Sequence, residues 1–230
     1  MKKDLTELVF ILDRSGSMSG LELDTIGGYN SLLEKQKNES GEAIITTVLF
    51  DDKYELLHNR LDVKEVIPIT SKEYFVRGST ALLDAIGATI NNIKTAQQNM
   101  AEEERPEKVL VTIITDGMEN HSREYSYDKV KTMIEAQKKL DWEFLFIGAN
   151  IDAIGEAGKF GISAERAVNY TADSRGTDMV YKSVSESIGF MRKEKFVRED
   201  WKREIEKDHL GRQEKNAKKG ILERLRNFAI

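Results

Sequence analysis

The stretch that decides the fold is LVFILDRSGSMSG, residues 8–20, in which five apolar residues run directly into a carboxylate, three hydroxyls and two glycines. Continuous apolar runs of this length are typical of parallel strands buried on both faces. In open α/β sheets, ligands bind beyond the carboxyl ends of such strands. The stretch therefore predicts a buried first strand followed by a polar loop, which is either a plain turn or a ligand site.

Similar apolar runs recur along the chain at 43–50, 109–114 and 144–147. The run 54–58 follows the turn residues of FDDK, and we interpret it as an antiparallel edge strand paired with the run before it. Between the runs, apolar residues recur at helical spacing. The helical sets are Leu83, Ile86, Ile90 and Ile93, then Tyr127, Val130 and Ile134, and then Val180, Val184, Ile188 and Met191. This alternation predicts an α/β fold: a doubly wound, mostly parallel central sheet with one antiparallel edge strand and helices on both faces.

The chain has 230 residues, a net charge of -5 and no cysteine, so disulfides and thiol chemistry are excluded. Residues 191–230 carry 13 Lys or Arg and 8 Asp or Glu, a net charge of +5, so residues 1–190 carry -10. We predict one domain over 1–196 and a charged helical extension over 197–230. Trp201, Ile205 and a stripe from Ile221 to Ala229 suggest docking on the domain, with glycine breaks at Gly211 and Gly220; a protruding basic arm is the alternative.

The N-terminus is too acidic, and its apolar run too short, for a signal peptide. No stretch approaches the roughly 18 apolar residues of a membrane span. We therefore expect a cytoplasmic protein with no membrane partner, and the net charge gives no reason to expect nucleic-acid binding.

Three polar loops should converge at the carboxyl edge of the predicted sheet. They contain Asp13, Ser15 and Ser17 after the first strand, Thr80 just before a helix, and Asp116 after the strand 109–114. The odd positions of D-x-S-x-S share one side of an extended turn. Carboxylate and hydroxyl oxygens are hard ligands that suit one Mg²⁺, or Mn²⁺ as its close substitute. We expect these five residues to bind a single ion.

The three motifs, D-x-S-x-S, the threonine of GSTALLDAIG, and ITDG, resemble in order and in strand context the metal-ion-dependent adhesion site of von Willebrand factor type A domains. The resemblance covers roughly residues 5–195. The stretch FIGANIDAIGEAGKFGI, near Gly148, is similar to a bacterial and phage intracellular branch of that family.

The resemblance implies a binding module with no catalytic residues rather than an enzyme. In this family the hydroxyls bind the ion directly, and the carboxylates bind it directly or through water. Neutral hydroxyls leave much of the charge of the ion uncompensated, so the ion should attract a Glu or Asp from a partner protein. Intracellular relatives suggest a related role, an adaptor or scaffold for an AAA+ ATPase or for a stress or phage complex.

Other interpretations of the same residues remain open. The hydroxyls of Ser17, Ser19 and Thr80 could simply cap helices. A phosphate cradle lacks the G-x-x-x-x-G-K-[ST] pattern. A Mg²⁺-dependent phosphatase of the haloacid dehalogenase type would need a second Asp where Ser15 stands.

Several neighbours could border the site. His121 and Glu119 are candidates for its rim, while Arg14 and Met18 either border the site and tune partner choice or are simply exposed. Asp84 either supports the site through a hydrogen bond or simply begins a helix. The glycines near Gly148 do not have the spacing of a dinucleotide motif, so they indicate a strand exit and close helix packing.

Overall fold

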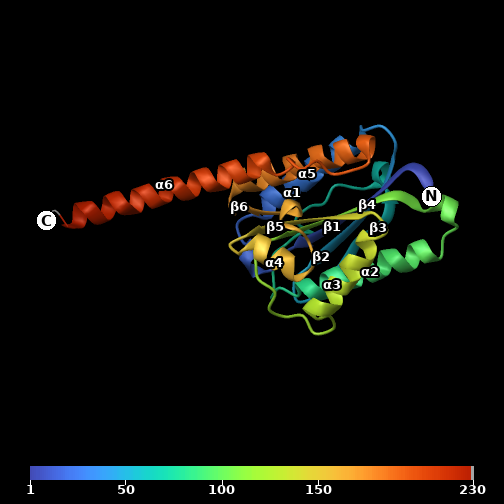
Figure 1. The fold of residues 1–230 in the computed structure, drawn as a ribbon, viewed down its shortest axis with the longest axis horizontal. Helices are drawn as coiled ribbons and strands as arrows, with labels where there is room; N and C mark the ends of the chain where they lie inside the picture. The colour runs from blue at the N-terminus through green and yellow to red at the C-terminus, as the bar shows by residue number, and fades with distance from the viewer. Residues whose placement is uncertain (229–230) are drawn as a thin grey trace.

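The computed structural model describes residues 1–228, with side chains described as far as Lys215 and again at Lys218. Within these residues the chain alternates between strands and helices (Figure 1). The strands are β1 (Lys2–Asp13), β2 (Glu42–Phe50), β3 (Tyr54–Asp62), β4 (Pro106–Thr115), β5 (Trp142–Ala149) and β6 (Ala167–Tyr170). The helices are α1 (Glu22–Lys37), α2 (Leu82–Gln98), α3 (Tyr127–Lys138), α4 (Ala153–Lys159), α5 (Ser174–Glu194) and α6 (Arg203–Phe228).

The strands form one sheet in the order β3-β2-β1-β4-β5-β6. All neighbouring pairs are parallel except β2 with β3, which is antiparallel. The predicted fold class is therefore confirmed, including the antiparallel edge strand. The parallel strands all end at the same edge of the sheet, which we call the carboxyl edge, and the polar loop after β1 lies there.

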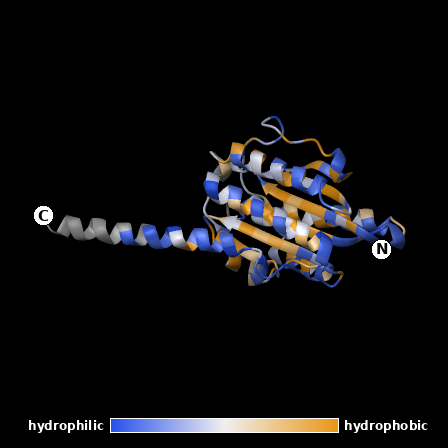
Figure 2. Ribbon diagram, turned by 90° about the horizontal axis from the view of Figure 1, so that it is seen from above, coloured by the Kyte–Doolittle hydropathy of each residue, from blue (hydrophilic) through white to orange (hydrophobic). Residues whose placement is uncertain are grey.

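Two layers of apolar side chains cover the sheet because successive residues of a strand point to opposite faces. In β1, Leu8, Phe10 and Leu12 pack with α1, α5 and the start of α6. Val9 and Ile11 pack on the opposite face with α2, α3 and α4. Figure 2 shows apolar strands at the centre of the body between helices with polar outer surfaces. The continuous apolar run of β1 is thus explained by burial on both faces.

The helix α6 docks on the body through its first turns. Trp201 and Ile205 are buried with the core of the α1 and α5 face, as the sequence predicts. Residues 203–228 form one continuous helix, so the predicted breaks at Gly211 and Gly220 are wrong. A glycine costs a helix only about 1 kcal/mol, and the docked first turns offset that cost. The predicted stripe from Ile221 to Ala229 lies outside the described side chains, and the boundary at 196 stays a prediction.

None of the helices in the described part of the chain combines the length and apolar character that a membrane crossing requires.

Candidate metal centre

The loops that carry the five predicted residues meet at the carboxyl edge. Asp13 is the last residue of β1, and Asp116 directly follows β4, the neighbour of β1 in the sheet. The backbone N–H of Gly16 donates to the carbonyl oxygen of Gly78 at 3.2 Å, which joins the first loop to the segment before α2. The N–H of Asn120 donates to the carbonyl of Thr80 at 3.0 Å, which joins that segment to the loop after β4. The structure therefore brings the three loops together.

Gly117 marks the point at which the hydroxyls converge. A Cβ atom on this glycine would lie 3.0 Å from Thr80 Oγ1, 3.1 Å from Ser17 Oγ and 3.8 Å from Ser15 Oγ. The two serine oxygens are themselves 3.0 Å apart. Three hydroxyl oxygens from two loops thus face one small space beside Asp116, and any side chain at position 117 would crowd it.

Asp116 is the residue whose chemistry is least satisfied. Its side chain is 2% exposed, and neither carboxylate oxygen has a hydrogen-bond partner within the part of the chain that the structure describes. Burial raises the pKa of this carboxyl. A buried carboxylate without partners is costly, and a bound cation would remove that cost.

Asp13 is equally buried but is held in place. Its Oδ1 accepts the backbone N–H of Ser15 at 2.7 Å, and its Oδ2 accepts the hydroxyl of Thr115 at 2.5 Å. Burial raises the pKa of the Asp13 carboxyl to about 6, against these hydrogen bonds, and the nearby charge of Asp116 adds a smaller rise. Thr115 was not predicted as part of the site; its position directly before Asp116 was the available signal.

Two acidic residues near the site serve the backbone rather than the rim. Glu119 accepts the N–H groups of His121 and Ser122 through Oε1, and that of Leu83, in the first turn of α2, through Oε2 at 2.9 Å. Glu119, a candidate rim carboxylate in the sequence, thus has both oxygens engaged by backbone N–H groups. Thr80 does not cap α2, whose N-cap is Ala81, because Glu119 meets one of the free N–H groups there instead.

Asp84 supports the same loop from α2. Its carboxylate accepts the backbone N–H groups of Arg123, Glu124 and Tyr125 at 2.8 to 2.9 Å. Of the two interpretations of Asp84, support of the site is thus the one that the structure favours, although it acts through the loop backbone. His121 is half-buried, and its N–H also donates to the carbonyl of Thr80 at 3.2 Å, which places it beside the site.

Arg14 and Met18 are both buried, so neither simple exposure nor a free side chain that tunes partner choice describes them. Arg14 is 0% exposed and Met18 is 2% exposed. Arg14 Nε donates to Asp51 Oδ2 at 2.8 Å, and Arg77 Nε donates to the same oxygen at the same distance. Although burial opposes it, these two guanidinium groups hold the pKa of the Asp51 carboxyl below its usual range. Arg14 therefore has a structural role: its ion pair with Asp51 anchors the first loop to the residues after β2.

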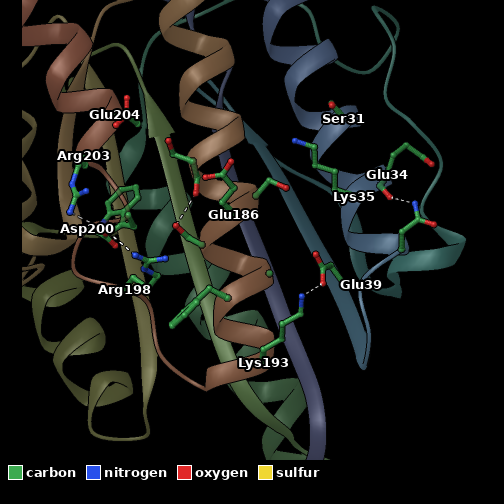
Figure 3. A pocket seen from close by; sticks show the side chains of 17 residues that line it. Ser31, Glu34, Lys35, Glu39, Glu186, Lys193, Arg198, Asp200, Arg203 and Glu204 are labelled. Carbon is green, nitrogen blue, oxygen red and sulfur yellow. Dashed lines mark hydrogen bonds and ion pairs between the residues drawn. The ribbon is translucent and has the colours of Figure 1, made fainter.

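Among the described residues, no group of three or more His, Cys, Asp or Glu side chains could hold a metal. A donor set at the carboxyl edge would instead combine two carboxylates with hydroxyls. A groove of about 980 Å³ lies elsewhere, between α1, α5 and the start of α6 (Figure 3). Its charges are largely paired, as in Lys193 with Glu39 at 2.9 Å and Arg198 with Asp200 at 2.8 Å. None of the five predicted residues lines it.

Known structures resemble most of this arrangement of strands and helices. One is proximal thread matrix protein 1 from the mussel byssus with a zinc-occupied MIDAS motif, with a TM-score of 0.55, 17% identity, and coverage of 82% of this chain and 47% of that one. Another is a von Willebrand factor type A structure from Catenulispora acidiphila, with a TM-score of 0.54, 14% identity, and coverage of 80% and 42%. The chain has the von Willebrand factor type A fold.

The D319A mutant of the PilB minor pilin from Streptococcus sanguinis is also similar, with a TM-score of 0.53, 11% identity, and coverage of 82% of this chain and 62% of that one. The chain thus spans about half the length of the solved structures that it matches. No protein-family model matches the sequence, and no curated protein does either. The von Willebrand type A fold is shown by structure alone, at identities well below 25%.

Proposed function

We propose that Asp13, Ser15, Ser17, Thr80 and Asp116 hold one divalent cation, Mg²⁺ or Mn²⁺, and that the loaded site binds an acidic residue of a partner protein. The observation that carries the proposal is Asp116, whose two buried oxygens have no hydrogen-bond partner among the described residues and lie beside three converging hydroxyls. Oxygen donors of this kind suit hard divalent cations. The cation would supply a positively charged partner for the two buried carboxylates.

The division of labour follows from the contacts of each residue. Asp116 and the hydroxyls of Ser15, Ser17 and Thr80 would face the ion. Asp13 is oriented by its hydrogen bonds to Ser15 and Thr115, and it would act directly or through water. The hydrogen bonds of Glu119 and Asp84 hold the loop that carries Asp116.

A carboxylate is the ligand chemistry that such a site would select. The two carboxylates of Asp13 and Asp116 equal the charge of a divalent cation in number. Part of the negative charge of Asp13 is already engaged by two hydrogen-bond donors, so the cation keeps some positive charge that a further anion would neutralise. Hydroxyl ligands are neutral, so a hard cation held mainly by them would favour an added anionic oxygen. A solved protein of this fold has zinc at its MIDAS motif, which supports a divalent cation at the corresponding loops of this chain.

We propose a non-enzymatic module that acts in the cytoplasm. The rival interpretation, a Mg²⁺-dependent phosphatase, would use Asp13 as nucleophile. Both oxygens of Asp13 already accept hydrogen bonds, and Ser15 occupies the position of the second Asp. Turnover of a generic phosphoester that is lost in Asp13→Asn would support the phosphatase and contradict the proposal.

Gly117→Ala tests the metal site without altering any proposed ligand. Its Cβ would lie 3.0 Å from Thr80 Oγ1 and 3.1 Å from Ser17 Oγ, in the space that the ion would need. Gly158→Ala is the matched control, because a Cβ there meets nothing within 4 Å. Calorimetric titration with Mn²⁺ should detect one site in the parent chain and the control, and none in Gly117→Ala. Equal Mn²⁺ binding by both variants would contradict the proposal.

A further inference from the structure

The helix α6 runs in the same direction as the parallel strands and passes beyond the carboxyl edge. Near its start, Lys202 Nζ donates to the carbonyl of Ala167, the first residue of β6, at 2.9 Å. Further on, His209 Nδ1 lies 3.2 Å from Thr171 Oγ1, just after β6 ends. The helix then continues to Phe228. Figure 1 shows it leaving the body on the side to which β6 points.

The projecting part, residues 213–228, is called the arm below. At about 1.5 Å per residue, the helix from His209 to Phe228 reaches about 28 Å beyond the end of β6. Because β6 is three strands from β1 and strands lie about 4.8 Å apart, β6 lies about 14 Å from the loop with Asp13. The arm therefore projects from the same side of the molecule as the candidate metal centre.

Ion pairs fix the direction in which the arm leaves the body. The side chain of Asp208 is 7% exposed, and it contacts Arg175 of α5 at 3.0 Å and Arg212 at 2.7 Å. Arg212 also pairs with Asp173, the N-cap of α5. Asp208 is the buried member of this network, and its carboxylate is shared between two guanidinium groups, which sets the direction of the helix at this turn. The arm is thus a continuation of a docked helix rather than a loose tail.

The arm is basic, whereas the rest of the chain is acidic. Residues 213–228 contain five Lys or Arg and two Glu, a net charge of +3. Because the whole chain carries -5 and the last two residues are uncharged, residues 1–212 carry -8. Lys215 and Lys218 are exposed, and Figure 2 shows polar residues where the helix leaves the body.

We propose that the arm is a second contact surface for the partner of the metal centre, and that this partner is an acidic protein which supplies one carboxylate to the ion and others to the arm. The inference rests on the proposed function, because it assigns the same partner to both surfaces. Two features favour an acidic protein: the metal centre selects carboxylates, and the basic arm stands on the same side. Charge complementarity across such a surface raises the rate of association, and a faster association at an unchanged dissociation rate raises the affinity.

The probe is a fluorescein-labelled peptide of about 20 residues, rich in Glu and spaced by Gly, which spans up to about 66 Å when extended. Its affinity for the full chain is measured by fluorescence anisotropy in Mg²⁺ and in EDTA. The arm variant is K215E/K218E/K219E. The control is K3E/K94E/K139E, which makes the same change in net charge at exposed lysines near the opposite edge of the sheet. Circular dichroism checks that both variants keep the parent helix content.

We expect the arm variant to bind the peptide about tenfold more weakly than the control variant, while Mg²⁺ still strengthens the binding of both. Equal affinities of the arm and control variants would overturn the inference and leave the metal centre untouched. An arm effect without any effect of Mg²⁺ in the parent chain would contradict the proposed function instead.

Two further measurements assign the arm to other partners if the inference is wrong. Sedimentation of the parent chain with vesicles of phosphatidylserine and phosphatidylcholine, but not of the arm variant, together with no arm effect on the peptide, would identify an anionic membrane surface. A dimer in sedimentation velocity that only the arm variant loses, again with no arm effect on the peptide, would identify a second copy of this chain.

Discussion

Asp13→Asn should stabilise the metal-free chain and at the same time abolish its stabilisation by divalent metal. The substitution keeps the shape of the side chain, so the acceptor for the N–H of Ser15 and the contact with Thr115 are both retained. It removes a negative charge from a site that is 1% exposed and lies near Asp116. The ionised carboxylate at this position therefore lowers the free energy of unfolding of the metal-free parent chain.

The magnitude follows from the pKa of Asp13, which burial raises from 3.8 to about 6. Each pH unit of such a shift corresponds to about 1.4 kcal/mol, so ionised Asp13 costs the folded state about 3 kcal/mol at neutral pH. Because the folded state binds the proton more tightly than the unfolded state, this cost is absent below about pH 4 and grows as the pH rises to about 6. Asp116, whose pKa is also raised by burial, acts in the same direction.

The assay is urea unfolding in EDTA at several pH values for the parent chain and Asp13→Asn. The variant should be more stable by about 3 kcal/mol at pH 7.5, and the difference should shrink toward pH 4. Mg²⁺ should reduce the stability advantage of the variant, because only the parent chain is stabilised by the ion. A variant that is less stable in EDTA at pH 7.5, or a difference that does not depend on pH, would refute the reasoning.

Three further outcomes test the supports of the site. Asp84→Ala removes the acceptor of three backbone N–H groups, and it should weaken Mn²⁺ binding about tenfold in calorimetry although no proposed ligand changes. An unchanged affinity would show that Asp84 does not support the metal centre. Arg14→Ala leaves the buried Asp51 with one guanidinium partner, and it should cost about 3–5 kcal/mol in urea unfolding; a loss below about 1 kcal/mol would show that Arg77 compensates. Trp201→Ala should undock α6, so that hydrogen exchange of its first turns accelerates while that of β4 does not; slow exchange in those turns would show that the ion pairs suffice.

The fold was predictable because burial on both faces leaves a direct mark on the sequence. The run Leu8 to Leu12 has no polar residue, and its members alternate between the two apolar layers of the sheet. The helical sets were predictable for the same reason, since Leu83, Ile86, Ile90 and Ile93 are all buried. The continuity of α6 across Gly211 was not, because local preference ignores the anchoring of Trp201 and Ile205.

The convergence of the three loops was predictable because it depends on where strands end, whereas the distant contacts around them were not. Arg14 stands between Asp13 and Ser15 in an extended loop, so alternation turns its side chain away from theirs, although the sequence did not predict its burial. Its partner Asp51 lies 37 residues away, which no local pattern reveals. The same holds for Glu119, whose carboxylate reaches the backbone of Leu83 in another element.

The most direct test of the central claim is an anomalous difference map from crystals of the chain grown with Mn²⁺. The account predicts one peak beside Gly117, within about 2.5 Å of hydroxyl oxygens of Ser15, Ser17 or Thr80, and no peak there in crystals of Gly117→Ala. A Mn²⁺ peak elsewhere on the molecule with none beside Asp116 would contradict it.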